Sequence, residues 1–190
     1  MIRTKMAIIK PMNFAGTASM NQRGFTLIEV LVTLALFAMI TTSVAPSLGN
    51  FFTRNKVAAT VNHVSSALQL ARHTAINENR FVVVCPTVDM ETCTGQTDWS
   101  LTKMIFVDEN GDGALNANEE IIGTADLVKD FHIKSTRSSV VFAPINTAGA
   151  TTATISICQK EDMQSFARAL SVSNVGRVRV EKDSALIDCS

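Results

Sequence analysis

The chain has 190 residues, of which 46% are hydrophobic and 18% are charged, with a formal net charge of zero. This length and composition fit one membrane segment plus one modest globular domain and exclude a large multidomain protein. Basic and acidic residues are distributed unevenly along the chain. Residues 1–24 carry four basic residues and no acid, which leaves 13 basic against 17 acidic residues, a net charge of −4, after Gly24.

The first predicted element is a long apolar helix. Residues 30–53 are 24 uncharged positions, and Arg54 is the next charged residue after Glu29. As a helix, this run is about 36 Å long against a hydrocarbon core of about 30 Å, so residues 25–53 are predicted to be the transmembrane half of a long helix. The basic residues before it favour a cytoplasmic N-terminus. A carboxylate just inside such a run is costly in a membrane, so Glu29 indicates a function.

The segment that opens this run resembles the processing site of type IV prepilins, with Gly24, Phe25 and Glu29 at the matching positions. The resemblance implies cleavage after Gly24 by a prepilin peptidase and N-methylation of Phe25. It also implies a helix that lies in the inner membrane first and packs in a filament afterwards. Glu29 then pairs with the N-terminal amine of a neighbouring subunit. Residues 1–24 become a leader, and Met20 offers an alternative start.

Two other interpretations compete for the same segment. An ordinary secretory signal needs a small-residue cleavage site after its apolar core. Residues 43–45 offer one, but Pro46 would directly follow the cut and is a poor neighbour for it. A plain single-span anchor has no reason to keep Glu29 in the span. The prepilin interpretation accounts for the motif, the basic leader and the apolar run together.

Residues 54–79 predict an amphipathic continuation of the helix, after a kink or a loosened turn at Pro46. His63 and His73 fall outside its apolar stripe and are expected to be solvated helix residues. The stripe has helical spacing, so we expect it to be buried against a sheet of the same chain. It consists of Val57, Val61, Val64, Leu68, Ala71 and Ala75.

Residues 80–190 predict a β-rich globular domain, because β-type runs alternate with turn clusters of Gly, Asn, Asp and Thr. A helix followed by short strands predicts an α+β fold with a small antiparallel sheet. The middle of the domain is acidic, since residues 86–126 hold nine acids against Lys103 alone. The predicted strands are Phe81–Cys85, Trp99–Val107, Ile121–Gly123, Phe131–Ile133, Val140–Phe142, Thr154–Cys158, Phe166–Val172 and Arg177–Val180.

Four cysteines follow the apolar run, and an even number in an exported domain predicts disulfides. Three pairings are possible, and the sequence favours Cys85–Cys93 and Cys158–Cys189. The first pair closes a short loop, and the second ties the last residues of the chain to a strand. A cysteine metal site is a weak alternative, because there is no CxxC and the histidines lie far from these cysteines in sequence.

The segment from Asp108 to Glu119 matches the EF-hand calcium loop at full length, with Asp108, Asn110, Asp112 and Glu119 as candidate ligands and Gly113 at the sharp turn. The residues before it read as a strand and not as an entering helix. The alternative is a hairpin turn in which the Asp and Asn side chains cap backbone amides. Calcium is therefore a weak candidate, and no other cofactor is indicated.

Four further segments narrow the resemblance from type IV prepilins in general to one family. They are the helix end Ala67-Leu-Gln-Leu-Ala-Arg72-x-x-Ala75, the strand end Val84-Cys85-Pro86, the hairpin Phe106-x-Asp108-x-Asn110, and Gly176-Arg177-Val178-Arg179. Together they resemble the FimT/GspH family, and the FimT minor pilins more than the secretion pseudopilins. The resemblance implies the type IV pilin fold, with a long N-terminal helix packed on a small antiparallel β domain.

In FimT-type pilins of naturally competent bacteria, a Gly-Arg-x-Arg tract is associated with binding DNA for uptake. In a strand, Arg177 and Arg179 share one face about 7 Å apart, and Val178 and Val180 point to the core. Two such guanidiniums can hold phosphates without reading sequence. Lys182, Lys134 and Arg137 are candidates to widen this basic patch. The alternative is that both arginines pair with Glu181, Asp183 or neighbouring acids on a solvated strand.

The sequence therefore predicts a minor type IV pilin that acts in pilus assembly or priming, with DNA binding for natural transformation as an added hypothesis. Its expected partners are other major and minor pilins, the prepilin peptidase, the inner membrane and DNA. It is expected as a single-pass inner-membrane protein with a periplasmic domain, and later on the pilus and cell surface. The alternative is a GspH-like minor pseudopilin of type II secretion that does not bind DNA. No catalytic or phosphate-binding motif points to an enzyme.

Overall fold

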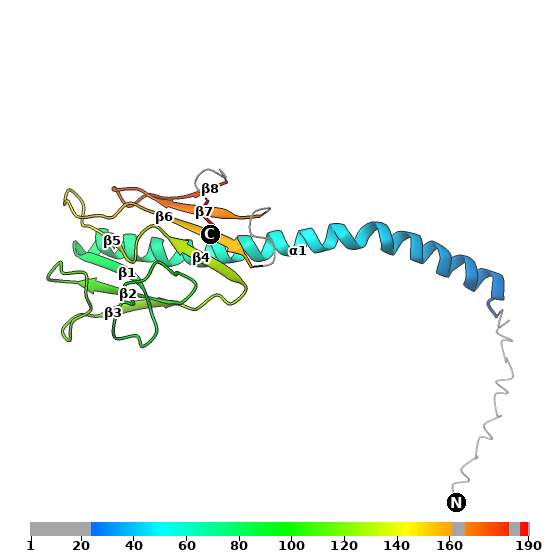
Figure 1. The fold of residues 1–190 in the computed structure, drawn as a ribbon, viewed down its shortest axis with the longest axis horizontal. Helices are drawn as coiled ribbons and strands as arrows, with labels where there is room; N and C mark the ends of the chain where they lie inside the picture. The colour runs from blue at the N-terminus through cyan, green and yellow to red at the C-terminus, as the bar shows by residue number, and fades with distance from the viewer. Residues whose placement is uncertain (1–23, 161–165, 183–186, 190) are drawn as a thin grey trace, which may run out of the picture. The chain divides into compact units, whose positions relative to one another are not determined.

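The computed structural model of the protein describes residues 24–160, 166–182 and 187–189, and it describes only the backbone of residues 43–47. Within these residues one long helix precedes eight strands, as Figure 1 shows. This is an α+β fold, as expected from the sequence. The elements are α1 (Leu27–Glu78), β1 (Phe81–Thr87), β2 (Thr102–Asp108), β3 (Ile121–Ala125), β4 (Phe131–Ser135), β5 (Val140–Phe142), β6 (Ala153–Gln159), β7 (Arg168–Val172) and β8 (Val178–Glu181).

The chain divides into two compact units between Val44 and Ala45, inside α1. The backbone of α1 is helical through position 46, where the sequence predicts a kink or a loosened turn. In the first unit the described side chains from Gly24 to residue 42 are all exposed, and in the second unit so are residues 48–52. Among the residues that the structure describes, no helix combines the length and the apolarity that crossing a membrane requires.

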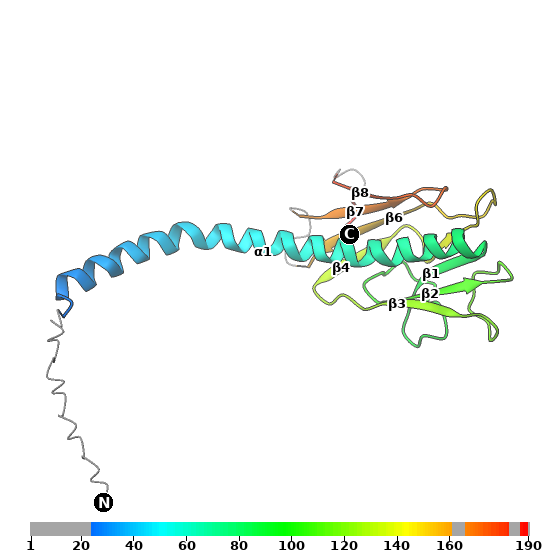
Figure 2. The same ribbon diagram turned by 180° about the vertical axis from the view of Figure 1, so that it is seen from behind.

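The second unit is built around the predicted helical stripe. All six apolar residues of that stripe are buried, from Val57 at 3% exposed to Ala75 at 0%. They belong to one core cluster with residues from both sheets, among them Val84 and Ile155. Figure 2 shows this half of α1 running across the strands. Burial of the stripe against sheets of the same chain is confirmed.

The strands form two antiparallel sheets, where the sequence predicted one. The first sheet has the order β3-β2-β1-β5, and the second has the order β4-β6-β7-β8. The difference arises because β5 pairs with β1, through Val82 and Phe142 among others, instead of joining the strands that flank it in sequence. Residues of both sheets then pack against the buried stripe of α1 in one core cluster.

Residues 97–101 belong to the connection between β1 and β2 of the first sheet, and they run along the edge of β4 in the second sheet before they enter β2. The sequence predicted a strand from Trp99, but β2 begins at Thr102 because the preceding residues pair with the edge of β4. The Trp99 amide donates to the Ile133 oxygen at 2.7 Å, and its indole Nε1 donates to the Arg137 oxygen at 3.0 Å. Trp99 is fully buried, so this connection is a fixed part of the core.

Two disulfides fix the loops and the C-terminus, in the pairings that the sequence favoured. Cys85 is bonded to Cys93, and Cys158 is bonded to Cys189. Cys85 also lies in a smaller core cluster with Phe106, on the face of the first sheet away from the main core cluster. Inside the Cys85–Cys93 loop, hydrogen bonds from the Thr92 and Glu91 amides hold the pKa of Asp89 far below its ordinary value.

Candidate functional site

The predicted processing residues lie immediately before α1. Gly24 and Phe25 precede the helix, and Phe25 is 83% exposed. Residues 1–23 of the predicted leader lie outside the described residues. Glu29 occupies the first turn of α1, and its amide donates to Thr26 Oγ1 at 3.3 Å. Thr26 and Glu29 have the spacing of a helix capping box, in which a Thr is followed three residues later by a Glu. This spacing predicts that the helix begins at Thr26, a signal that the sequence analysis missed.

The helix leaves a long apolar surface uncovered in the described chain. From Phe25 to Phe52, fourteen large hydrophobic side chains are exposed. Soluble monomers rarely expose contiguous apolar patches of this extent. Among the side chains of α1 that the structure describes, Val57 is the first buried one, so the burial pattern of the helix changes near this residue.

The Gly-Arg-Val-Arg tract spans the end of the β7–β8 turn and the start of β8, the edge strand of the second sheet. The β7–β8 turn is closed by hydrogen bonds from the Gly176 amide to the Ser173 oxygen at 2.8 Å and from the Ser173 amide to the Arg177 oxygen at 3.0 Å. Gly176 has φ of +71°, a conformation that favours glycine. Arg179 pairs with Ser171 in the ladder, so Arg177 and Arg179 share the face that points away from the core.

Both arginines are exposed and available for a ligand. Neither forms an ion pair with a residue of the described part of the chain. Glu181 lies two residues beyond Arg179 on the same face of β8, and Asp183 lies outside the described residues. The alternative pairing with Glu181 is therefore not formed.

The other basic candidates are distributed unevenly around this face. Arg137 is exposed and borders the same shallow depression as Ser171 and Ser173, the residues opposite Arg179 and Arg177. The strand register places Lys134 on the same face as Arg179. However, it lies on β4, and three strand spacings, or roughly 14 Å, separate β4 from β8. It is also paired with Asp188 at 2.9 Å. Lys182 is exposed just after β8.

The prediction that Val178 and Val180 both point to the core holds only in part for Val180. Val178 packs against the main core, but Val180 is 49% exposed. It borders a groove with Arg54 and Ala58 of α1, residues that leave its side chain uncovered. Val57, Val61 and Phe166 line the same groove, so Val180 lies on the predicted side of β8, but as a residue of the edge strand it stays half exposed.

In the segment from Asp108 to Glu119, acidic side chains accept hydrogen bonds from backbone amides, which is the hairpin turn that the sequence predicted as the alternative to a calcium loop. The buried Asp108 carboxylate accepts the amides of Gly111 and Gly113 at 2.7 and 2.9 Å. Glu119 accepts the amides of Glu109 and Asn116 at 3.0 and 2.9 Å. Gly113 has φ of +75°, as the predicted sharp turn requires.

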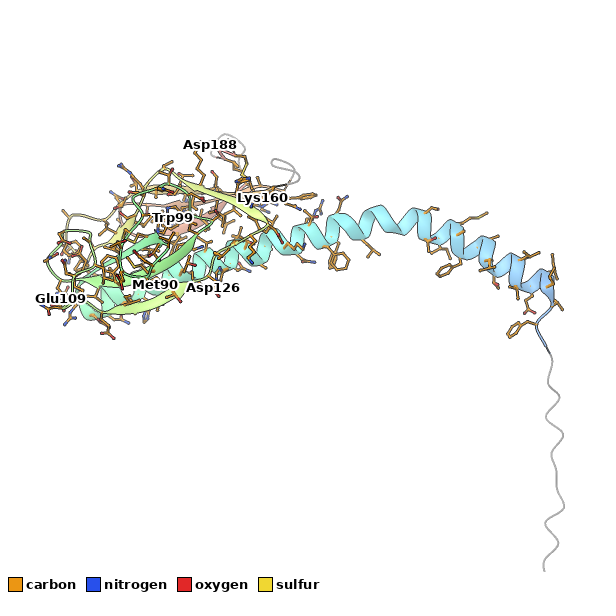
Figure 3. The ribbon with its side chains drawn as sticks, turned by 60° about the horizontal axis from the view of Figure 1, so that its bottom comes forward. Met90, Trp99, Glu109, Asp126, Lys160 and Asp188 are labelled. Atoms are coloured by element: carbon orange, nitrogen blue, oxygen red, sulfur yellow. A yellow bond between two sulfur atoms is a disulfide. The ribbon has the colours of Figure 1, made fainter. Side chains whose placement is uncertain are left out.

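Asp112 takes part in the same network. Its pKa is held below the ordinary value by the Ala114 amide first, and then by the Asn116 and Asn110 side chains. Across the described residues, no group of three or more His, Cys, Asp or Glu side chains is arranged to hold a metal ion. Glu109 is also paired with Arg80 at 3.0 Å. In Figure 3 Glu109 and Asp188 are well separated, so the two ion pairs stabilise different parts of the domain.

Comparison with known proteins places this fold in a family. A family model described as type II transport protein GspH matches residues 60–176, which is more than half of the chain. The chain belongs to the GspH family. A second model, the prokaryotic N-terminal methylation motif, matches residues 19–45 and includes Gly24, Phe25 and Glu29.

Relatives of this GspH-family protein include pilus proteins. Two fimbrial proteins of Pseudomonas aeruginosa are each 30% identical over 107 residues, which are 56% of this chain and 66% of their own length. The chain thus spans just under two thirds of the relatives it matches. A crystal structure of the type IV minor pilin FimU from Pseudomonas aeruginosa strain PAO1 superposes with a TM-score of 0.51 at 21% identity, covering 69% of this chain and 92% of that chain.

The GspH-family protein therefore has the fold of a type IV minor pilin, as expected from the sequence. The family model shows the family, and the likeness to the minor pilin shows the fold alone. Proteins of this family and fold are structural proteins and not enzymes.

Proposed function

We propose that this GspH-family protein is a minor type IV pilin that assembles with other major and minor pilins in a complex that primes or caps a retractable pilus. The observation that carries the proposal is the exposed apolar half of α1, which begins directly after the methylation motif. An apolar surface of this extent marks an interaction site, and packing against the same helices of neighbouring subunits in a filament buries it. The likeness to a minor pilin fold supports the same role.

The proposed route starts with a prepilin peptidase that cleaves after Gly24 and methylates Phe25. Before assembly, the apolar half of α1 is held in the inner membrane, with residues 54–190 in the periplasm. The new amine at Phe25 lies four residues before Glu29, in the segment that leads into α1. A carboxylate among apolar helices is strongly stabilised by a cationic partner, so Glu29 selects the amine of a neighbouring subunit during packing. The assembled protein then reaches the pilus and the cell surface.

Deletion of the gene tests this role against the pseudopilin alternative, which the name of the matching family model favours. The proposal expects loss of surface pili, measured by shearing and immunoblotting of the major pilin, with secretion of type II substrates unchanged. A strain that carries the wild-type gene on a plasmid is the control. Normal piliation with a secretion defect would assign the protein to the secretion machine.

We further propose that the exposed face of the second sheet captures extracellular DNA without reading its sequence, as a step in natural transformation. Arg179 lies on the edge strand β8 and Arg177 immediately before it, and Arg137 borders the depression lined by their partners Ser171 and Ser173. Guanidiniums that lack a carboxylate partner can hold phosphate oxygens by paired hydrogen bonds. The overall acidic charge of the mature chain predicts weak and strongly salt-dependent binding.

A mobility shift with the mature full-length chain in mild detergent tests this site. Replacement of both Arg177 and Arg179 by Gln should strongly weaken binding to duplexes of unrelated sequence, and loss of two phosphate contacts should reduce the salt slope of the remaining binding by about 1.8. Lys134→Gln is the matched control, because that lysine lies across the sheet and is paired with Asp188. It should change binding little. Equal loss in the control and the double variant would show a general charge effect and not a site.

A further inference from the structure

A pocket of about 440 Å³ lies in the second unit where α1 ends. Its walls come from three segments that are far apart in sequence: α1 at Arg72 and Ile76, the loop that follows β5, and the β7–β8 turn. Figures 1 and 2 both show that loop and that turn at the C-terminal end of α1. The pocket is separate from the outward face that carries Arg177 and Arg179.

Arg72 supplies the charge of this pocket. Its side chain is half-buried, and within the described part of the chain its guanidinium has no hydrogen-bond or ion-pair partner. It packs under Gly176, where an added Cβ would lie 3.5 Å from the Arg72 Nε and 3.1 Å from the Phe142 Cδ1. The turn thus holds the guanidinium partly out of water without an acceptor. Such a group is costly to desolvate, and a ligand that pairs with it would remove the cost.

The pocket is lined by both apolar and neutral polar residues. Ile145 from the loop after β5 and Val175 from the β7–β8 turn are 60% and 70% exposed, and the exposed Asn146, Thr147 and Asn174 also line it. No Asp or Glu lines the pocket, and Arg177 directly follows its last lining residue, Gly176. The site therefore offers one lining cation beside exposed apolar side chains and neutral hydrogen-bonding groups. This combination fits an anion that is carried between apolar groups.

We infer that this pocket docks a partner protein, which inserts an acidic side chain flanked by apolar residues. A carboxylate matches the guanidinium in charge and in paired hydrogen-bond geometry, and the flanking apolar groups cover Ile145 and Val175. The volume suits a single side chain with its neighbours. A nucleic-acid backbone fits less well, because its sugar-phosphate chain is charged at every step and would leave Ile145 and Val175 in contact with charge. A partly desolvated arginine beside exposed apolar residues is the composition of an interface anchor.

The inference can be tested by NMR on the mature full-length chain in mild detergent, by following the Arg72 Nε–H signal and the methyl groups of Ile145 and Val175. The probe is the peptide acetyl-Leu-Asp-Leu-amide, and its matched control is acetyl-Leu-Asn-Leu-amide, which has the same shape without the charge. The Asp peptide should shift all three signals saturably. Equal shifts from the Asn peptide, or no shift from either, would overturn the inference. A stronger response to inorganic phosphate or to a 12-base-pair duplex would overturn it in favour of a phosphate site.

Variants separate binding from folding. Arg72→Gln should weaken binding of the Asp peptide by about tenfold or more, since it removes a charge-assisted hydrogen-bond pair. Lys129→Gln is the matched control, since Lys129 is exposed and does not line the pocket, and it should leave peptide binding unchanged. Ile145→Asp keeps Arg72 and alters only an exposed residue, so it should preserve the fold and weaken binding through repulsion. Unchanged binding in Ile145→Asp and in a folded Arg72→Gln would contradict the inference.

Discussion

The indole nitrogen of Trp99 donates a hydrogen bond to the main-chain oxygen of Arg137 at 3.0 Å. The two residues are 38 positions apart: Trp99 lies in the connection between β1 and β2, and Arg137 lies in the connection from β4 to β5, which joins the two sheets. Because Trp99 is fully buried, it fixes the backbone of Arg137, whose side chain borders the proposed DNA-binding face. The packing of the core and the geometry of that face are therefore linked.

Trp99→Phe should keep most of the buried ring volume but leave the Arg137 oxygen without its donor, at a cost of about 1–2 kcal/mol in the free energy of unfolding. Trp99→Ala should cost about 3–5 kcal/mol because it also opens a cavity. Urea denaturation of the full-length chain measures both. An alanine variant as stable as the phenylalanine variant would show that the ring does not carry the packing of this junction.

Lys103 should give the protein an unusual alkaline stability profile. It is 1% exposed, its Nζ donates to the Trp99 and Asp126 oxygens at 3.2 Å, and burial lowers its pKa to about 8 from an ordinary 10.5. Asp126 and Asp98 partly offset that effect. Between pH 8 and 10.5 the unfolded chain binds more protons than the folded one, so stability attributable to Lys103 rises with pH in this window.

The difference in unfolding free energy between the wild type and Lys103→Met isolates this effect. It should rise by up to about 1.4 kcal/mol per pH unit from pH 8 towards 10.5 and be flat below pH 7. Lys129→Met is a control, since Lys129 is exposed on the loop before β4. A difference that does not change with pH would mean that Lys103 is not desolvated in the folded state.

The two disulfides should contribute unequally to stability. Cys85–Cys93 spans 8 positions and Cys158–Cys189 spans 31. On loop entropy, the first should stabilise by roughly 2–3 kcal/mol and the second by roughly 3–4 kcal/mol. Double Cys→Ser variants of each pair, compared by thermal denaturation, measure the order. The second variant should also release Asp188 from Lys134 and from Ser156. The reverse order of stability would show that packing of the buried Cys85 outweighs chain entropy.

Glu29→Gln should separate folding from assembly. The change keeps the size of the side chain and removes its charge, and Glu29 is exposed in the first turn of α1, so the globular unit should be unaffected. The variant should be processed but should enter pili poorly beside wild-type subunits. Thr26→Ala is the matched control, because it removes the helix cap and keeps the acid. Wild-type incorporation of Glu29→Gln would mean that the acid is not an intersubunit partner.

Features with a local period could be predicted from the sequence, and features that depend on distant pairing could not. The helical stripe from Val57 to Ala75 and all eight strands follow from spacing and turn residues. The separation into two sheets depends on β5 joining β1, which no local pattern encodes. Val180 has the same alternation as Val178 but lies on an uncovered edge. The pocket at Arg72 combines three distant segments, so the helix sequence alone gives no sign of it.

The N-terminus of the protein in sheared surface pili tests the central proposal most directly. Pili from cells that express the chain should be sheared, purified and analysed by mass spectrometry of N-terminal peptides, with a strain lacking the gene as the control. The account predicts a peptide that begins with N-methylated Phe25, present at a low ratio to the major pilin, and absent when Gly24 is replaced by Ala. A mature N-terminus near Pro46, or a chain that is absent from piliated cells' filaments, would contradict it.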